Sequence, residues 1–166
     1  MQAKMRNLGE ACTAANRIYV HRSIAAEFTR RLTERMSALR LGDGSDPSVD
    51  VGPLVNAATR DKVAEFVQDA VAKGARIECG GSVPEGRGFF YPPTVLSGVP
   101  EAADCVHDEI FGPVAAIQTF TDQDEVIRRA NDTEYGLVAY VFSRDFRRAM
   151  QAVSYTHLTL PTSDLV

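Results

Sequence analysis

The chain has 166 residues, of which 45% are hydrophobic and 24% charged, and its net charge is −4. These proportions are typical of a soluble globular domain that can bury a sizeable core. Acidic and basic residues are interspersed, which disfavours a nucleic-acid partner, and every apolar run is shorter than the roughly 20 residues of a membrane helix. Lys4, Arg6 and Glu10 interrupt any signal-peptide pattern. We therefore expect a cytoplasmic protein with no nucleic-acid or membrane partner.

The three cysteines, Cys12, Cys79 and Cys105, are odd in number and widely spaced. This fits free thiols in a reducing compartment better than a disulfide framework. A zinc site in "CVHDE" at 105–109 is disfavoured, because three closely spaced ligands have no distant partner. A Cys–His pair of the protease type is also unsupported, because no histidine is placed near Cys12 by the sequence. We expect no bound metal.

Strand and helix patterns alternate along the chain. Apolar periodicity predicts helices at 10–15, 23–39, 57–73, 121–132 and 144–153. β-Branched and aromatic residues between turn signals predict strands at 16–21, 75–79, 112–120 and 136–143. The extended segment 88–96 contains Pro92 and Pro93, which favour the edge of a sheet. Ser23 is the predicted N-cap of the helix at 23–39, with Ile24, Phe28, Leu32, Met36 and Leu39 on its apolar face.

This alternation predicts an α/β fold in which helices flank a mostly parallel sheet in layers. No glycine-rich loop lies between a strand and a helix, so we expect no phosphate-binding loop. The predicted domain covers 1–153. The segment 154–166 continues no pattern, and we predict that it is a non-native tail.

Cys12 follows Gly9 by three residues in "RNLGEACTAANR", at 6–17. A free cysteine is most often a small buried residue. Here, however, glycine permits a sharp turn, and the predicted helix at 10–15 would bring its N-terminal dipole and N–H groups to the sulfur. These groups favour the thiolate and could hold an oxyanion formed when the sulfur attacks a carbonyl. We therefore predict that Cys12 is a nucleophile.

"NLGEAC", at 7–12, resembles the active-site cysteine signature of the aldehyde dehydrogenase superfamily, whose usual form is Asn-x-Gly-Gln-x-Cys. Glu10 stands where glutamine is commoner. "EIFGPV", at 109–114, resembles the second signature of that family, and the following "ANDTEYGLVAYVFSRD" also matches. Two motifs about a hundred residues apart in this order are far more specific than either alone. The resemblance covers residues 1–153.

The resemblance implies an enzyme that oxidises an aldehyde with NAD or NADP, through a thiohemiacetal and then a thioester on Cys12. It implies that the Cys12 backbone N–H forms half of an oxyanion hole. It also implies that Glu109 binds the hydroxyls of the nicotinamide ribose and that Phe111 packs beside the nicotinamide ring. Taken alone, such a glutamate is usually a solvated edge residue and such a phenylalanine is more often core, so these roles depend on the joint motif.

Arg6 lies six positions before Cys12, where its planar guanidinium could bind a substrate carboxylate. "AKMRNLGEACTAANRIYVH" resembles the succinate-semialdehyde dehydrogenase branch, in which an arginine has this place and role. The resemblance thus implies oxidation of succinate semialdehyde to succinate. The alternatives are an aldehyde dehydrogenase for another small or amino aldehyde, and a non-enzymatic α/β binding module. Ala14 stands where some members of the branch carry a redox-switch cysteine, so we expect no such switch.

Several parts of the family pattern are not found in this sequence: the nucleotide-binding region, the glutamate base, the asparagine of the oxyanion hole and the oligomerisation strand. The resemblance therefore implies an incomplete catalytic domain whose parent enzyme is a homo-oligomer. We expect the chain by itself to be inactive, because general-base chemistry and cofactor binding each lack components.

Overall fold

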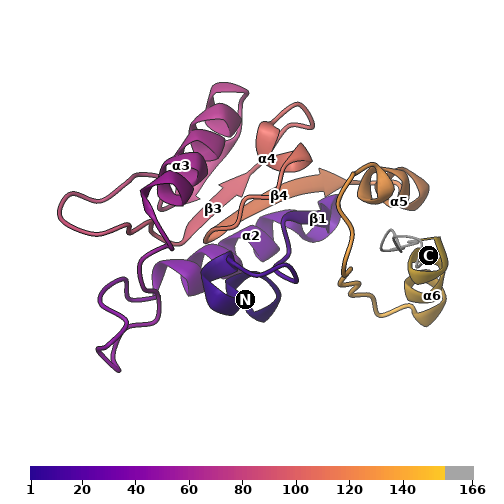
Figure 1. Ribbon diagram of the computed structural model, residues 1–166. Helices are drawn as coiled ribbons and strands as arrows, with labels where there is room; N and C mark the ends of the chain where they lie inside the picture. Colours follow the sequence, from indigo (N-terminus) through magenta and orange to yellow (C-terminus); the bar gives the residue numbers. More distant parts are fainter. Residues whose placement is uncertain (156–166) are drawn as a thin grey trace, which may run out of the picture. The chain divides into compact units, whose positions relative to one another are not determined.

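A computed structural model describes residues 1–155, and their side chains as far as 152 (Figure 1). The chain forms two compact units, Met1–Thr119 and a second that begins at Phe120. The first unit carries both sequence motifs. None of the described helices combines the length and the apolar character that a bilayer crossing requires.

A four-stranded sheet in the order β1-β4-β3-β2 forms the centre of the first unit. β3 and β4 are parallel, and β2 pairs with β3 in the antiparallel direction. The strands are β1 Arg17–His21, β2 Arg76–Cys79, β3 Thr94–Ser97 and β4 Val114–Phe120. The helices are α1 Gln2–Met5, the 3-10 helix η1 Arg6–Gly9, α2 Arg22–Ser37, α3 Ala57–Ala72 and α4 Asp104–His107. The predicted α/β class is confirmed.

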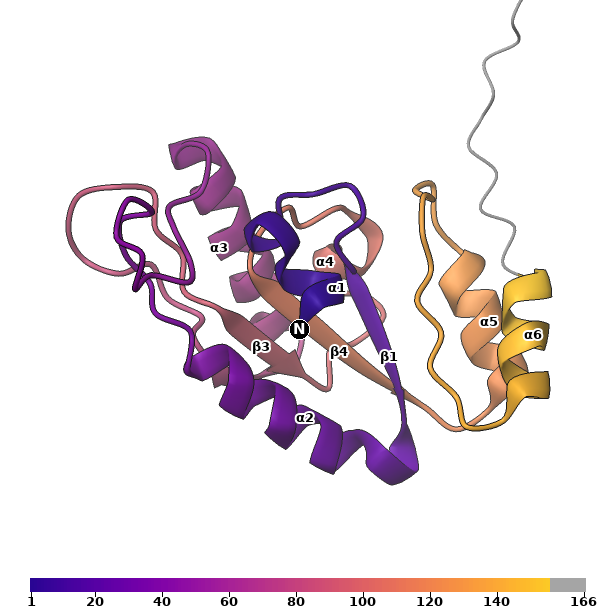
Figure 2. The ribbon, with the colours of Figure 1, turned by 90° about the horizontal axis from the view of Figure 1, so that it is seen from below.

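Helices cover both faces of this sheet, α2 on one side and α3 with α4 on the other (Figures 1 and 2). Successive residues of the central strands point to opposite faces, so the two faces have separate cores. One core joins Val95, Ala115 and Ile117 to Leu32 and Met36 of α2. The other joins Leu96, Val114 and Ala116 to Val63, Val67 and Ala70 of α3 and to Cys105 and Val106 of α4. Burial on both faces explains why β3 and most of β4 are buried without alternation.

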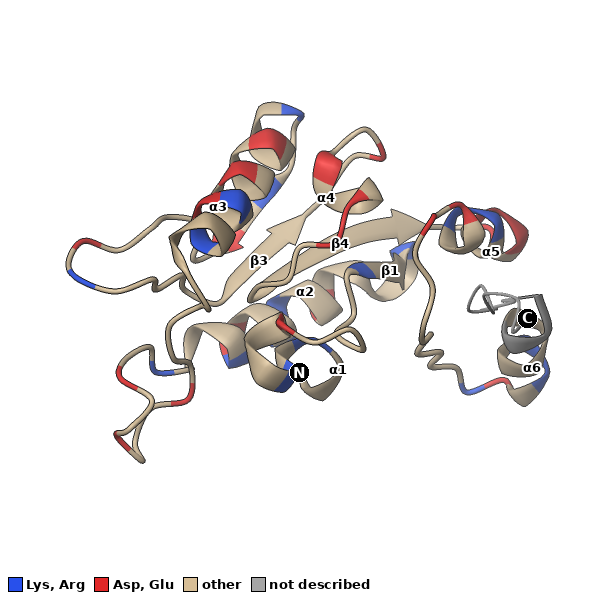
Figure 3. Cartoon of the chain, viewed as in Figure 1, with Lys and Arg blue, Asp and Glu red and all other residues tan. Residues whose placement is uncertain are grey.

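The solvent-facing side of α2 carries ion pairs in which Arg30 contacts both Glu27 and Glu34, and Arg31 contacts Glu27. Acidic and basic side chains are interspersed on the helices (Figure 3). Exposed pairs of this kind contribute little, with a median of about 0 to 1 kcal/mol. The two apolar cores, rather than these pairs, therefore hold the helices on the sheet.

The prediction that Pro92 and Pro93 direct their segment to a sheet edge is wrong. Both prolines precede β3, which starts at Thr94, lies between β4 and β2, and is buried along its length. A proline lacks a donor only at its own position, so a strand that starts after the prolines keeps its hydrogen-bond ladder. Thr94 itself donates its backbone N–H to the Pro113 carbonyl at 2.8 Å.

The predicted helix at 23–39 is confirmed as α2, with two differences. Its N-cap is His21, whose Nδ1 accepts a hydrogen bond from the Ser23 backbone N–H at 3.3 Å, and not Ser23. The apolar face is buried in the second half of the helix, at Leu32 and Met36, whereas Ile24 is 57% exposed. The buried residues of this face are therefore Leu32 and Met36 in the C-terminal half, while Ala25 in the N-terminal half is partly buried against the same core.

The second unit contains α5 Gln123–Asn131 and α6 Phe146–Tyr155, as the helical patterns predicted. The predicted strand at 136–143 is wrong: no strand forms there, and Phe142 is 89% exposed. A strand needs a neighbour to satisfy its backbone N–H and C=O groups, and none of the described strands pairs with this segment. The tail predicted at 154–166 lies outside the described residues, apart from its first two, which end α6.

Truncating a core residue of the sheet should test whether the buried apolar cores, rather than exposed residues of the helices, stabilise the fold. Ile117 is 1% exposed in β4, and we expect Ile117→Ala to lower the free energy of unfolding by about 2 to 5 kcal/mol. Ile24→Ala makes the same chemical change at an exposed site and should alter it by less than about 0.5 kcal/mol. Urea titrations of both variants measure the difference. Equal losses would mean that the core between the sheet and α2 does not stabilise the fold.

Candidate active site

The two sequence motifs are in direct backbone contact. Gly9 has φ +82°, and a Cβ added to it would lie 2.2 Å from the carbonyl oxygen of Gly112. Only glycine combines this left-handed conformation with so close an approach. The contact joins η1 and the turn that follows it to the loop immediately before β4, so segments about a hundred residues apart in the sequence share one site.

Unusual backbone conformations gather in these same motifs. Among the described residues, the non-glycine positions with positive φ are Asn7 (+47°), Leu8 (+61°) and Phe111 (+48°). Each such position costs of order 1 to 3 kcal/mol and persists only where its surroundings hold it. The Asn7 side chain donates to the Glu10 carbonyl at 2.9 Å, which helps to hold the first pair. Strain of this kind is found preferentially at functional sites.

Cys12 lies in a tight turn and not in a helix, so the prediction of a helix at 10–15 is wrong. The turn is closed by a hydrogen bond from the Ala14 N–H to the Ala11 carbonyl at 2.8 Å. The few residues between Gly9 and β1 are too short a stretch to repay helix nucleation. The argument from a helix dipole at the sulfur therefore fails. The Cys12 backbone N–H, however, has no hydrogen-bond partner among the described residues, so it can still act as an oxyanion donor.

The three thiols differ sharply in their environments. Cys12 is exposed, Cys79 is half-buried and Cys105 is buried. Burial raises the pKa of Cys105 to about 11 and also raises the pKa of Cys79. A thiol that is buried and protonated is a poor nucleophile. The exposed Cys12 is therefore the thiol that an external electrophile can reach.

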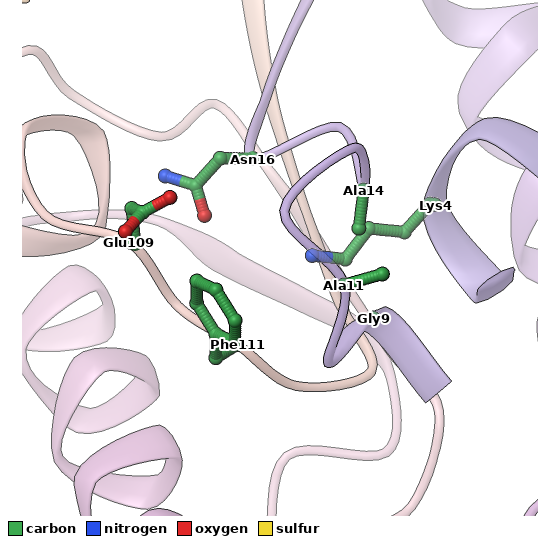
Figure 4. Close-up of a pocket in the computed structure, with 7 residues that line it drawn as sticks. All are labelled: Lys4, Gly9, Ala11, Ala14, Asn16, Glu109 and Phe111. Atoms are coloured by element: carbon green, nitrogen blue, oxygen red, sulfur yellow. The ribbon is translucent and has the colours of Figure 1, made fainter. Parts of the chain in front are cut away.

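A small pocket opens where the two motifs meet (Figure 4). It is lined by Lys4, Gly9, Ala11, Ala14, Asn16, Glu109 and Phe111. The structure thus brings together Glu109 and Phe111, two of the predicted site residues, beside the residue that precedes Cys12. Cys12 and Arg6 are exposed and are not among the lining residues.

Glu10, which departs from the commoner glutamine, connects the thiol turn to another loop. Its Oε1 accepts a hydrogen bond from the Val55 backbone N–H at 3.2 Å. The side-chain carbonyl oxygen of a glutamine at this position could accept the same hydrogen bond, so either residue is compatible with it. This equivalence gives a physical reason why glutamate is compatible with the motif.

Lys4 is a pocket residue that the sequence reasoning missed. It is only 3% exposed, and burial lowers the pKa of its ammonium group to about 8. Its side chain extends past Ala14 and Ala11 into the pocket (Figure 4), and no ion pair or hydrogen bond joins its ammonium to the described residues. A lysine in a four-residue helix gives no periodic signal that would mark it as buried.

The chemistry of the pocket fits part of a nucleotide cofactor. The half-exposed carboxylate of Glu109 can accept hydrogen bonds from sugar hydroxyls, and the ring of Phe111 offers an apolar face to a flat heterocycle. No group of three or more His, Cys, Asp or Glu side chains within the described part of the chain is arranged to hold a metal ion.

Comparison with known proteins defines the class. A sequence model of the aldehyde dehydrogenase family matches residues 1–158, and the chain belongs to this family. Among solved structures, succinate-semialdehyde dehydrogenase from Burkholderia pseudomallei has a TM-score of 0.90 and 38% identity over 92% of this chain and 32% of its own.

Curated relatives with known names include two types of aldehyde dehydrogenase. Succinate-semialdehyde dehydrogenase of Paenarthrobacter nicotinovorans is 52% identical over 151 residues, which are 91% of this chain and 34% of that enzyme. A probable succinate-semialdehyde dehydrogenase [NADP(+)] of Sinorhizobium fredii is 45% identical, with shares of 89% and 30%. Betaine aldehyde dehydrogenase of Brucella ovis is 41% identical, with shares of 92% and 32%. The chain spans about a third of the length of these relatives.

The Gly9 contact should not tolerate a side chain. We expect Gly9→Ala to lower the free energy of unfolding by at least about 2 kcal/mol, because it adds a left-handed alanine and a clash with the Gly112 carbonyl. Gly44→Ala, at a glycine with nothing within 4 Å of an added Cβ, is the matched control and should change stability little. Chemical denaturation compares them. A Gly9→Ala variant as stable as the control would show that the motifs do not need this contact.

The buried Lys4 should make stability depend on pH. Its folded pKa of about 8 lies below the unfolded value of 10.5, so the unfolded state holds the extra proton between these values. The free energy of unfolding should therefore rise as the pH increases from 8 to 10.5. Lys4→Met should remove this rise and be more stable at pH 7 by up to about 3 kcal/mol.

Urea titrations at pH 7, 9 and 10 measure the effect as the difference between the parent chain and Lys4→Met. Other groups titrate in both proteins and cancel in this difference. A difference that stays constant across the three pH values would show that Lys4 keeps an ordinary pKa.

Proposed function

We propose that this chain supplies the catalytic thiol and part of the cofactor site of an aldehyde dehydrogenase that uses NAD+ or NADP+. The observation that carries the proposal is the backbone contact of Gly9 with Gly112. It places the turn of an exposed cysteine against a pocket that contains Glu109 and Phe111. Ala11, the residue before Cys12, lines this pocket together with Glu109 and Phe111.

In this proposal Cys12 attacks the aldehyde. Its Sγ forms a bond to the carbonyl carbon, and the electron pair of the C=O double bond moves to the oxygen. The backbone N–H of Cys12 has no hydrogen-bond acceptor among the described residues, and it would donate a hydrogen bond to that oxygen. The exposed turn lets an aldehyde approach the sulfur, which neither Cys79 nor Cys105 allows to the same degree.

Glu109 and Phe111 would hold the nicotinamide end of the cofactor, Glu109 through the ribose hydroxyls and Phe111 against the ring. When bound, NAD(P)+ supplies the hydride acceptor for the oxidation. Cys12 would then carry the acyl group as a thioester, and attack by water would release the acid and the free thiol. Support for this cofactor class comes from the names of relatives, such as the NADP(+) enzyme of Sinorhizobium fredii.

The proposed substrate is succinate semialdehyde. Arg6 is exposed at the start of η1, and its guanidinium forms no ion pair with a described residue, so it can take up a substrate carboxylate. The similarity to betaine aldehyde dehydrogenase favours a second candidate, the cationic betaine aldehyde. A guanidinium attracts a carboxylate and repels a quaternary ammonium, so Arg6 favours the acidic aldehyde.

The test uses a chimera in which residues 1–153 replace the matching segment of the Paenarthrobacter nicotinovorans relative. We expect NAD(P)H formation with succinate semialdehyde, abolished by Cys12→Ser. Arg6→Ala should raise KM for succinate semialdehyde by 10- to 100-fold, the order expected for loss of a charged hydrogen bond, and leave turnover of butanal unchanged. Arg35→Ala, at an exposed arginine of α2, is the control.

Each of the other outcomes has a distinct meaning. If the parent chimera oxidises both aldehydes without preference, or if Arg6→Ala leaves KM for succinate semialdehyde unchanged, the family chemistry is kept and the proposed substrate is refuted. A preference for betaine aldehyde would favour the second candidate. A folded chimera that oxidises none of the three aldehydes would refute the proposed activity.

A further inference from the structure

Asn16 connects the end of the thiol turn by three hydrogen bonds to the segment 105–110, which leads into the second motif. Its Nδ2 donates to the carbonyl oxygens of Cys105, at 3.2 Å, and Asp108, at 2.8 Å. Its Oδ1 accepts from the backbone N–H of Ile110 at 2.9 Å. An asparagine amide offers two donor hydrogens and one acceptor oxygen, so both kinds of group are used here.

These bonds hold the backbone on both sides of Glu109. Asp108 and Ile110 are its immediate neighbours in the chain, and each is bonded to the same side chain. Ile110 is fully buried, so if the Asn16 side chain were removed, water could not easily replace it as the acceptor for the Ile110 N–H. Asn16 itself is four residues from Cys12, at the end of the thiol turn. The amide therefore sets the position of Glu109 relative to the thiol.

We propose that Asn16 is a positioning residue that acts through Glu109 on cofactor binding. The inference rests on the proposed function, in which Glu109 binds the nicotinamide ribose. Asn16 touches neither the aldehyde nor the sulfur in this scheme. Its loss should displace a carboxylate that must meet two hydroxyl groups, and displacements of about 1 Å in such contacts are costly.

The experiment uses the same chimera. Asn16→Ala should raise KM for NAD(P)+ at least tenfold, with a smaller change in kcat, and the rate of Cys12 alkylation by iodoacetamide should stay within twofold. Asn131→Ala removes an asparagine hydrogen bond to the Ile127 carbonyl within α5 and is the matched control. All of its values should stay within twofold of the parent.

A double-mutant cycle separates positioning from a general structural role. If Asn16 acts through Glu109, Asn16→Ala should have little further effect on KM for NAD(P)+ in a Glu109→Ala background. Should Asn16→Ala fail to fold, Asn16→Asp replaces it. This variant keeps the shape and the bond from Ile110 but faces two carbonyl oxygens with a carboxylate, so it should raise KM as well.

The proposal is overturned if KM for NAD(P)+ stays within twofold, if Cys12 alkylation slows as much as cofactor use, or if the effects of Asn16→Ala and Glu109→Ala are additive. Binding of NADPH, followed by fluorescence, gives the same comparison without turnover. A chimera whose NADPH affinity depends on Glu109, and on Asn16 only while Glu109 is present, but which oxidises no aldehyde would refute the proposed activity and leave the positioning role supported.

Discussion

The close approach of two glycine backbones, Gly9 and Gly112, is the constraint on which the rest of the site depends. Gly112 lies two residues before β4, whose first residue is buried in the core against α3. The contact thus ties the thiol turn to the loop that leads into a buried core strand. A side chain at position 9 would push the turn away from the sheet, and every distance between Cys12 and the pocket would change with it.

The central sheet stabilises the fold, whereas the two motifs beside it contain strained backbone. The two cores around β3 and β4 bury apolar side chains on both faces, which is the main favourable contribution to folding. Positive φ angles at Asn7, Leu8 and Phe111 in the two motifs offset part of that stability. So does the buried ammonium of Lys4, which lies in α1 and lines the pocket. A strained site of this kind needs a stable support. The first motif precedes β1 and the second leads directly into β4, so both are attached to the sheet.

Local patterns were sufficient to predict β1, β4, α2, α3 and α5, because periodicity acts within one element. They failed where structure depends on a neighbour. The apolar stretch at 136–143 reads as a strand but has no strand beside it in the described chain. The turn at 10–15 follows Gly9, which contacts Gly112, and its Glu10 accepts a hydrogen bond from Val55. At the site, Cys12, Glu109 and Phe111 were found through motifs, and their roles remain predictions. Lys4 and Asn16 were missed, because their environments come from residues that are distant in the sequence.

In the proposed function, substrate choice and bond formation would be carried by different parts of one short segment. Arg6 begins η1 and Cys12 follows Gly9, so the left-handed glycine lies between the residue proposed to select the substrate and the residue proposed to attack it. A change at position 6 alters the charge presented to the far end of an aldehyde without touching the Gly9 contact or the amide of Asn16. This separation offers a physical reason why relatives named for an acidic aldehyde and for a cationic one can both be more than 40% identical to this chain.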